Sequence, residues 1–173
     1  MDKKGLKFGF NDTGFTLLEV IIILVISSIL VSLAVPSLFG LTERARFRLV
    51  VQNVNRRLLE ARSRSISDMS LRTGVYFDLT SDPQRIISFY DDDDDGTKFK
   101  YDHGTDEIRL SIFEVPPDIE ISVPAGNGIV DNVVVFRSNG IPHTGGTIQV
   151  ASTNGLQATL QVLETTGRIR FLD

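Results

Sequence analysis

The sequence predicts an α+β protein in which a long N-terminal helix packs on a domain of antiparallel β-sheet. Two observations carry this prediction. Residues 15–39 are apolar almost throughout and lead into a stretch with helical spacing, whereas the apolar period drops to two after Gly74. Spacing of three or four residues indicates an amphipathic helix, and alternation indicates strands with one buried face. We expect a leader at 1–14, helices at 15–39 and 40–70, and a β-rich domain at 71–173.

The apolar segment 15–39 is long enough to cross a membrane, because at about 1.5 Å rise per residue it exceeds a hydrocarbon core of about 30 Å. Its only ionisable side chain is Glu19. A carboxylate in a membrane span is costly and normally has a partner. Glu19 either lies near the helix end and reaches the headgroups, or pairs with a cation. Cleavage between Gly14 and Phe15 would supply that cation as a new α-amino group four residues away.

The second helical segment, from Thr42 to about Ser67, is one-sided. We expect Pro36, just before it, to kink or loosen the helix, because proline removes a helical hydrogen bond. Apolar residues recur at helical spacing: Phe47, Val50, Val51, Val54, Leu58 and Ala61. Arginines occupy the rest of the circumference: Arg44, Arg48, Arg56, Arg57, Arg62 and Arg64. We interpret them as a solvated face that also meets lipid phosphates, with acidic surfaces of neighbouring subunits and nucleic acid as alternatives.

The domain after Gly74 is expected to form short antiparallel strands, with the amphipathic helix covering one apolar face. Three segments alternate clearly, with Val75, Phe77, Leu79, Ile108, Leu110, Ile112, Ile119, Ile121 and Val123 inward, and Tyr76, Asp78, Arg109, Ser111, Glu120 and Ser122 outward. Further strand candidates are 86–90, 98–101, 133–137, 147–151, 156–163 and 168–172. Gly, Pro and Asn punctuate the gaps between them.

Composition excludes several kinds of chemistry. The chain has no cysteine, so it forms neither a disulfide nor a thiolate metal site. No nucleotide is expected, because no Walker-type or dinucleotide-type glycine loop is present. His103 and His143 lack the sequence context of a hydrolytic triad, so a membrane-anchored hydrolase is not expected. Residues 71–173 carry eight Lys/Arg against sixteen Asp/Glu, which predicts a soluble domain that repels nucleic acid on average.

An acidic run between two strand candidates leaves two interpretations open. Read from Asp91, it has the D-x-D-x-D-G skeleton of a calcium loop with Asp91, Asp93 and Asp95, and Asp102 at the twelfth position. A divalent cation would relieve the repulsion among these carboxylates. However, flanking helices are not predicted, and Lys98 occupies a position that is usually apolar. A solvated acidic loop is the alternative, and we expect no other cofactor.

The segment G-FTLLEV with the apolar run after it resembles the class III signal of type IV pilins and type II secretion pseudopilins. The resemblance implies that a prepilin peptidase cuts after Gly14 and methylates the amine of Phe15. Glu19 becomes the fifth residue of the mature chain and the assembly charge. It further implies a single-pass protein of the bacterial inner membrane with a periplasmic C-terminal domain, which assembles with other pilin or pseudopilin subunits into a filament.

Two short segments resemble the GspH/FimT branch of this superfamily. They are the V-F-R-S-N-G stretch at 135–140 and the terminal G-R-I-R that begins at Gly167. In that branch G-R-x-R is found in minor pilins that bind DNA for uptake, and similar endings occur in secretion pseudopilins. The resemblance therefore implies a non-enzymatic minor pseudopilin or pilin subunit. The alternative is a DNA-binding minor pilin in which Arg168 and Arg170 contact DNA.

Overall fold

The computed structural model describes residues 16–68, 71–91, 99–101 and 109–172; within these ranges, the side chains of residues 33–41 and of residue 109 are not described. The chain divides into two compact units, Met1–Thr42 and Glu43–Asp173. Helix α1, Leu17–Ser67, contains both predicted helical segments, and its backbone stays helical at Pro36.

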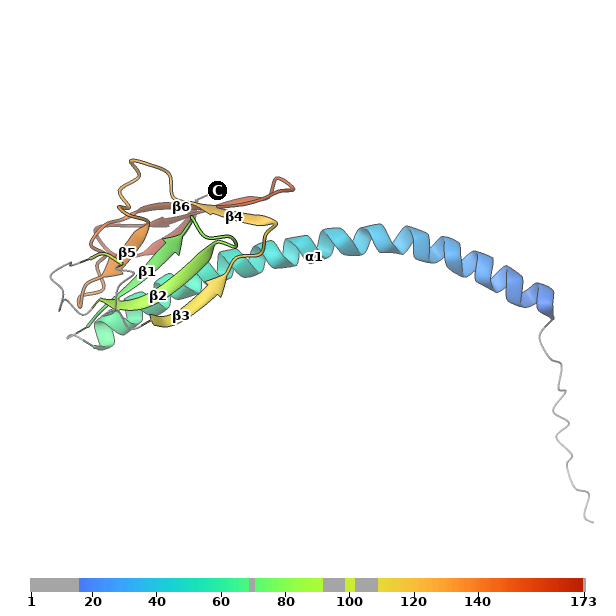
Figure 1. The fold of residues 1–173 in the computed structure, drawn as a ribbon, viewed down its shortest axis with the longest axis horizontal. Helices are drawn as coiled ribbons and strands as arrows, with labels where there is room; N and C mark the ends of the chain where they lie inside the picture. The colour runs from blue at the N-terminus through green and yellow to red at the C-terminus, as the bar shows by residue number, and fades with distance from the viewer. Residues whose placement is uncertain (1–15, 69–70, 92–98, 102–108, 173) are drawn as a thin grey trace, which may run out of the picture. The chain divides into compact units, whose positions relative to one another are not determined.

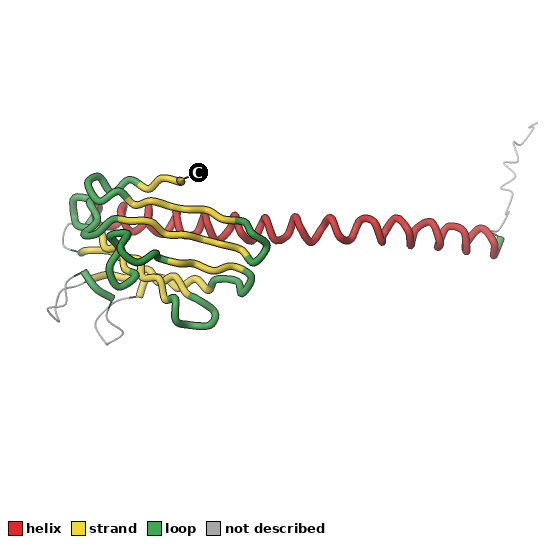
Figure 2. Tube along the Cα trace, turned by 90° about the horizontal axis from the view of Figure 1, so that it is seen from above, coloured by secondary structure: helices red, strands yellow, loops and turns green. Residues whose placement is uncertain are grey.

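In the described residues, eight strands form two antiparallel sheets of four strands each (Figures 1 and 2). Sheet 1 has the order β3-β2-β1-β5, and sheet 2 the order β4-β6-β7-β8. The strands are β1 Arg72–Asp78, β2 Arg85–Asp91, β3 Arg109–Glu114, β4 Ile119–Ser122, β5 Val133–Phe136, β6 Gly146–Ser152, β7 Gln157–Val162 and β8 Ile169–Leu172. The predicted α+β class is confirmed. In the described residues, the strand predicted directly after Gly74 and seven of the other predicted strands are present.

One apolar core joins the second half of α1 to both sheets. The helix contributes Val50, Val51, Val54, Leu58 and Ala61, the stripe that helical spacing predicted. Sheet 1 adds Phe77 and Phe136, and sheet 2 adds Ile148 and Leu160, all fully buried. Burying a side chain of this size stabilises a fold by roughly 1.5–3 kcal/mol. This shared core is what holds α1 against the sheets.

The other face of sheet 1 carries a smaller cluster. It contains Ile87, Phe89, Tyr101, Val133 and Val135. The ring of Tyr101 stacks on that of Tyr76 with centroids 4.5 Å apart and meets Phe89 edge-on at 5.0 Å. Strands β1 and β5 are therefore buried on both faces, which explains why their burial does not alternate.

Strand β3 corrects the predicted phase of 108–112. Ile112 was expected inward but is 46% exposed, whereas Phe113 packs against the main core. The reason is an irregularity in the ladder: Ser88 pairs with Ser111, but Phe89 pairs with Arg109. A bulge of this kind inserts an extra residue and exchanges the two faces. Ile108 lies outside the described residues.

Two further expectations for the sheets are wrong. The candidate strand at 98–101 is not a strand in its described part, where Phe99 takes a turn conformation with a φ of 65°. Asp78 was expected outward but is buried at the end of β1. Its carboxylate accepts hydrogen bonds from the backbone N–H and hydroxyl groups of Thr80 and Ser81. These donors replace water and make the burial tolerable.

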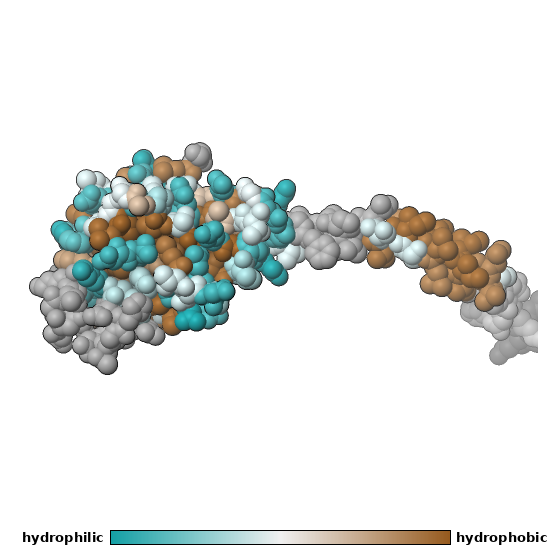
Figure 3. Space-filling view, turned by 45° about the horizontal axis from the view of Figure 1, so that its top comes forward, coloured by the Kyte–Doolittle hydropathy of each residue, from teal (hydrophilic) through white to brown (hydrophobic). Residues whose placement is uncertain are grey.

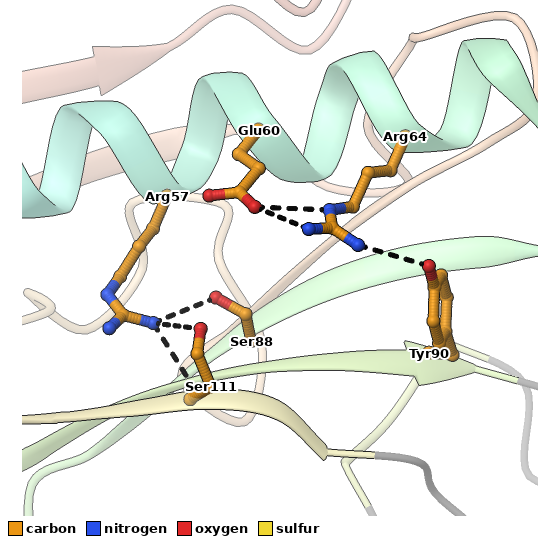
Figure 4. Close-up of polar contacts among 6 residues, drawn as sticks. All are labelled: Arg57, Glu60, Arg64, Ser88, Tyr90 and Ser111. Atoms are coloured by element: carbon orange, nitrogen blue, oxygen red, sulfur yellow. Dashed lines mark hydrogen bonds and ion pairs between the residues drawn. The ribbon is translucent and has the colours of Figure 1, made fainter.

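Arg57 also departs from prediction, because it does not belong to a solvated arginine face. It is 5% exposed and lies where α1 faces β2 and β3 (Figure 4). Its Nη1 donates to the Oγ atoms of Ser88, at 3.1 Å, and Ser111, at 2.7 Å. Burial lowers the pKa of Arg57. Two helical turns further along α1, Arg64 binds Glu60 at 2.6 Å and the hydroxyl of Tyr90 at 3.2 Å. The arginines on this side of α1 fasten it to sheet 1.

Replacing Arg57 with alanine is expected to lower the free energy of unfolding of a fragment that begins at Glu43 by roughly 2 kcal/mol, because the buried hydroxyl of Ser88 and the part-buried hydroxyl of Ser111 lose their donor. The measurement is chemical denaturation followed by circular dichroism. Arg56→Ala is the matched control, since Arg56 is exposed and, among the described residues, bonds only to Asn53 on its own helix. Equal losses in both variants would contradict the role given to Arg57.

Candidate functional site

The first turn of α1 holds the assembly residue expected from the sequence. Thr16 precedes the helix, and its Oγ1 accepts a hydrogen bond from the backbone N–H of Glu19 at 3.2 Å. Thr16 is thus the N-cap and Glu19 the third helical residue, which is the T-x-x-E pattern of a capping box. A carboxylate here is favoured by the helix dipole. Sequence reasoning treated Glu19 only as a charge in an apolar run, although the spacing to Thr16 was visible.

The apolar side chains of residues 17–32 are exposed. Leu17 is 80% exposed, and Leu24 and Leu30 are both more than 60% exposed. Figure 3 shows this apolar surface along the described N-terminal part of α1. Large contiguous apolar surfaces on single chains mark sites that contact a membrane or another protein. This stretch is therefore the main candidate interaction surface of the chain.

Two expectations for this region reach past the described residues. Gly14 and Phe15, the expected processing and methylation residues, lie outside them. The expected membrane span at 15–39 also includes the undescribed side chains of 33–41.

Within the described part of the chain, no helix combines the length and the apolar composition that a membrane crossing requires.

Arg170 lies on an edge strand, β8, which pairs only with β7 in the described sheets, and Arg168 directly precedes that strand. The side chains of Arg168 and Arg170 are exposed, and Ile169 packs against the core, as the alternation predicted. Nε of Arg170 donates to Oε1 of Gln161, its cross-strand partner, at 2.8 Å. The two arginines are therefore on the surface, and DNA contact through them stays a prediction.

The two segments that resemble the GspH/FimT branch meet in space. A Cβ on Gly167 would overlap the carbonyl oxygen of Gly140. Arg62 of α1 joins them, because its Nε donates to the carbonyl of Gly140 and its Nη2 to that of Thr166, both at 3.1 Å. Both glycines have positive φ, 73° and 65°. Sequence reasoning missed this contact and the part of Arg62 in it, because no local pattern links positions so far apart.

The acidic loop is described only at its edges. Asp91 ends β2 and is 4% exposed; its Oδ2 accepts from Nε of Arg72 and from the backbone N–H of Phe99, both at 3.0 Å. Asp93, Asp95 and Asp102 lie outside the described residues. Among the residues that are described, no group of three potential metal ligands occurs. A calcium site in this loop stays a prediction.

The two histidines were not expected to be catalytic. The ring of His143 stacks on Phe99 with centroids 3.9 Å apart, and its Nδ1 is 3.1 Å from Nη2 of Arg137. Burial first, and then the charge of Arg137, lower the pKa of His143. These contacts link the loops around sheet 1, which is a packing role. His103 lies outside the described residues.

Comparisons with known proteins agree with the N-terminal motif and the fold. The family model of the prokaryotic N-terminal methylation motif matches residues 10–35. A comparison with curated protein sequences finds no match. Two solved structures of the minor pseudopilin EpsH from the type II secretion system of Vibrio cholerae resemble this one. The first is 17% identical to this chain with a TM-score of 0.51, and the match covers 74% of this chain and 94% of the EpsH chain.

The second EpsH structure is 18% identical to this chain with a TM-score of 0.52, and the match covers 73% of this chain and 95% of the EpsH chain. At such identities the likeness establishes the fold. The motif is the prokaryotic N-terminal methylation motif, and the fold is one that the minor pseudopilin EpsH shares. The resemblance drawn from the sequence is thereby confirmed: the methylation motif and this fold are together those of the type IV pilin-like and pseudopilin superfamily.

Proposed function

We propose that this chain is a minor pseudopilin or pilin subunit of a type II secretion or type IV pilus machine, of the GspH/FimT type and without enzymatic activity. Prepilin peptidase removes residues 1–14 and methylates Phe15. The apolar segment 15–39 holds the subunit in the bacterial inner membrane, with the β-domain in the periplasm, until the subunit enters a filament. What carries this proposal is the methylation motif at 10–35 on a pseudopilin-like fold.

The exposed apolar side chains of α1 support assembly through this helix. The apolar side chains of residues 17–32 are exposed, so lipid or other subunits must cover them. Lipid covers the helix while the subunit is stored, and the helices of neighbouring subunits replace lipid in a filament. Such an exchange keeps the apolar surface out of water throughout assembly.

Glu19 sets the register of this packing in our proposal. Cleavage after Gly14 leaves the methylated amine at Phe15, one residue before the N-cap Thr16. The carboxylate of Glu19 is exposed on the described chain. In the apolar interior of a filament, a carboxylate and an amine on adjacent helices attract each other strongly, and an unpaired one is costly. Subunits therefore settle at the offset that brings the two together.

Replacing Glu19 with valine is expected to leave cleavage intact and to reduce incorporation into filaments more than tenfold, because the amine at Phe15 loses its partner. The measurement compares the amount of the chain in sheared filaments with that in membranes by immunoblotting. Glu43→Val is the control, since Glu43 also lies on α1 but after the apolar segment, and this variant should assemble normally. Wild-type incorporation of the Glu19 variant would contradict the pairing role.

A further inference from the structure

A cleft at one end of the β-domain takes no part in the assembly described above. It forms where three connections meet: the β1–β2 turn, the β3–β4 connection and the β6–β7 turn. Its volume is about 410 Å³, which is within the range of roughly 300–1,000 Å³ that ligand pockets occupy. Residues of unit Glu43–Asp173 alone line it.

The walls of this cleft are held in place by hydrogen bonds between the connections. The side chain of Gln84 bonds the backbone of Ile121 twice, at 2.7 Å and 3.2 Å. The backbone N–H of Val115 donates to the carbonyl of Gln84 at 2.8 Å, and that of Thr153 to the carbonyl of Asp118 at 3.0 Å. Prolines further restrict the lining segments. The cleft is thus preformed, which reduces the entropy lost when a partner binds.

The cleft is lined by acidic side chains that form no ion pairs in the described residues. Asp82, Asp118 and Glu120 line it, and it has no lysine or arginine among its lining residues. None of these three carboxylates takes part in an ion pair within the described ranges. Oδ1 of Asp118 is buried and accepts no hydrogen bond. A buried carboxylate oxygen without a donor is costly, so a donor from outside would be stabilising here.

The spacing of the carboxylates decides which cation fits. They do not form a group that could hold a metal ion in the described part of the chain. Asp82 lies in the β1–β2 turn, Asp118 in the β3–β4 connection and Glu120 on β4. Carboxylates on separate segments suit several donors on one partner surface, such as arginine side chains one helical turn apart. Guanidinium groups bind carboxylates through two parallel hydrogen bonds.

The chain itself carries such a pair. Arg44 and Arg48 lie four residues apart on α1, so they project from one side of the helix. Both side chains are exposed, and neither forms an ion pair within the described ranges. We propose that the acidic cleft lined by Asp82, Asp118 and Glu120 docks Arg44 and Arg48 of a second copy of this chain. The contact goes beyond the proposed function, because it assigns a specific surface of the β-domain to subunit pairing.

Disulfide trapping in native membranes tests this contact, because the chain has no cysteine of its own. Two differently tagged full-length copies are expressed together, one with Glu120→Cys and the other with Arg48→Cys. We expect a linked species that carries both tags, at least tenfold more abundant than with Glu164→Cys in place of Glu120→Cys. Glu164 is an exposed acid in the β7–β8 turn, at the end of β7 that is opposite the cleft. Equal linkage at both positions would overturn the proposal.

Charge reversal tests the chemistry of the contact in the same linked pair. Arg44→Glu in the copy with Arg48→Cys should lower linkage at least fivefold, because it places a carboxylate opposite Asp82 and Asp118. Adding Asp82→Arg to the other copy should restore it. If neither change alters the amount of linked species, the cation-docking role of the cleft is overturned.

A third readout separates this contact from the proposed function. If Glu120→Cys and Arg48→Cys never link while the chain still enters filaments, the second-copy contact is overturned and the proposed function stands. If that cysteine pair never links and the double variant Asp82→Arg/Glu120→Arg fails to enter filaments, the cleft docks a different subunit. That result likewise overturns the second copy as its occupant.

Discussion

A chain that carries Gly14→Val is expected to keep its leader, whereas the wild-type chain is expected to lose residues 1–14. The resemblance to prepilins places Gly14 directly before the cut, where a branched side chain crowds the carbonyl that the peptidase attacks. We expect cleavage to fall below one tenth of the wild-type extent. The measurement is the intact mass of the chain after expression in cells that contain a prepilin peptidase.

Gly9→Val is the matched control for this experiment. Gly9 lies in the same leader, but five residues before the expected cut. This variant should be processed as the wild-type chain is, which shows that the loss at Gly14 reflects the cleavage site itself and not the leader in general. Normal processing of the Gly14 variant would make the leader assignment wrong.

Gly167→Ala is expected to lower the free energy of unfolding of the fragment from Glu43 by about 3 kcal/mol. Two effects add. Gly167 has a φ of 65°, a left-handed conformation that costs other residues roughly 1–2 kcal/mol. The new Cβ would also overlap the carbonyl oxygen of Gly140, and backbone cannot move aside cheaply; overpacking of this kind costs typically about 1–3 kcal/mol. Thermal and chemical denaturation measure the loss.

Gly155→Ala separates these two effects. Gly155 also has a positive φ, 83°, but a Cβ there would meet no atom within 4 Å. Its substitution should cost only the conformational part, about 1 kcal/mol. If both alanine variants lose the same stability, the close contact between Gly167 and Gly140 does not contribute, and the junction made by Arg62 has no special importance.

The junction of Gly140, Gly167 and Arg62 also gives the branch-like segments a structural meaning. A Cβ on Gly167 would overlap the carbonyl oxygen of Gly140, and a Cβ on Gly140 would meet the side chain of Ile66 on α1. Both segments also lie beside a backbone carbonyl bonded by Arg62. Close packing and positive φ together therefore explain the glycines of these segments. Arg168 and Arg170 are not, since both remain exposed. Any functional selectivity of the G-R-I-R segment thus rests on its arginines.

Much of the fold could be predicted because it depends on local pattern. The helical stripe from Val50 to Ala61 follows from spacing within single turns, and it forms the helix side of the core as expected. Alternation at Ile119 and Ile121 likewise placed both side chains in the core. The same logic failed at Ile112, because the bulge in β3 depends on how that strand pairs with β2.

The candidate site divides in the same way. The amino-acid sequence by itself determined the contiguous features: the methylation motif at 10–35, the apolar run and the β-rich domain. Tertiary structure alone decided that Arg57 is buried and donates hydrogen bonds to Ser88 and Ser111, and that Gly140 contacts Gly167. It also brought the carboxylates of the cleft together from separate segments. The physical reason is range: local patterns reflect neighbours along the chain, whereas contacts between distant segments depend on the path of the folded backbone.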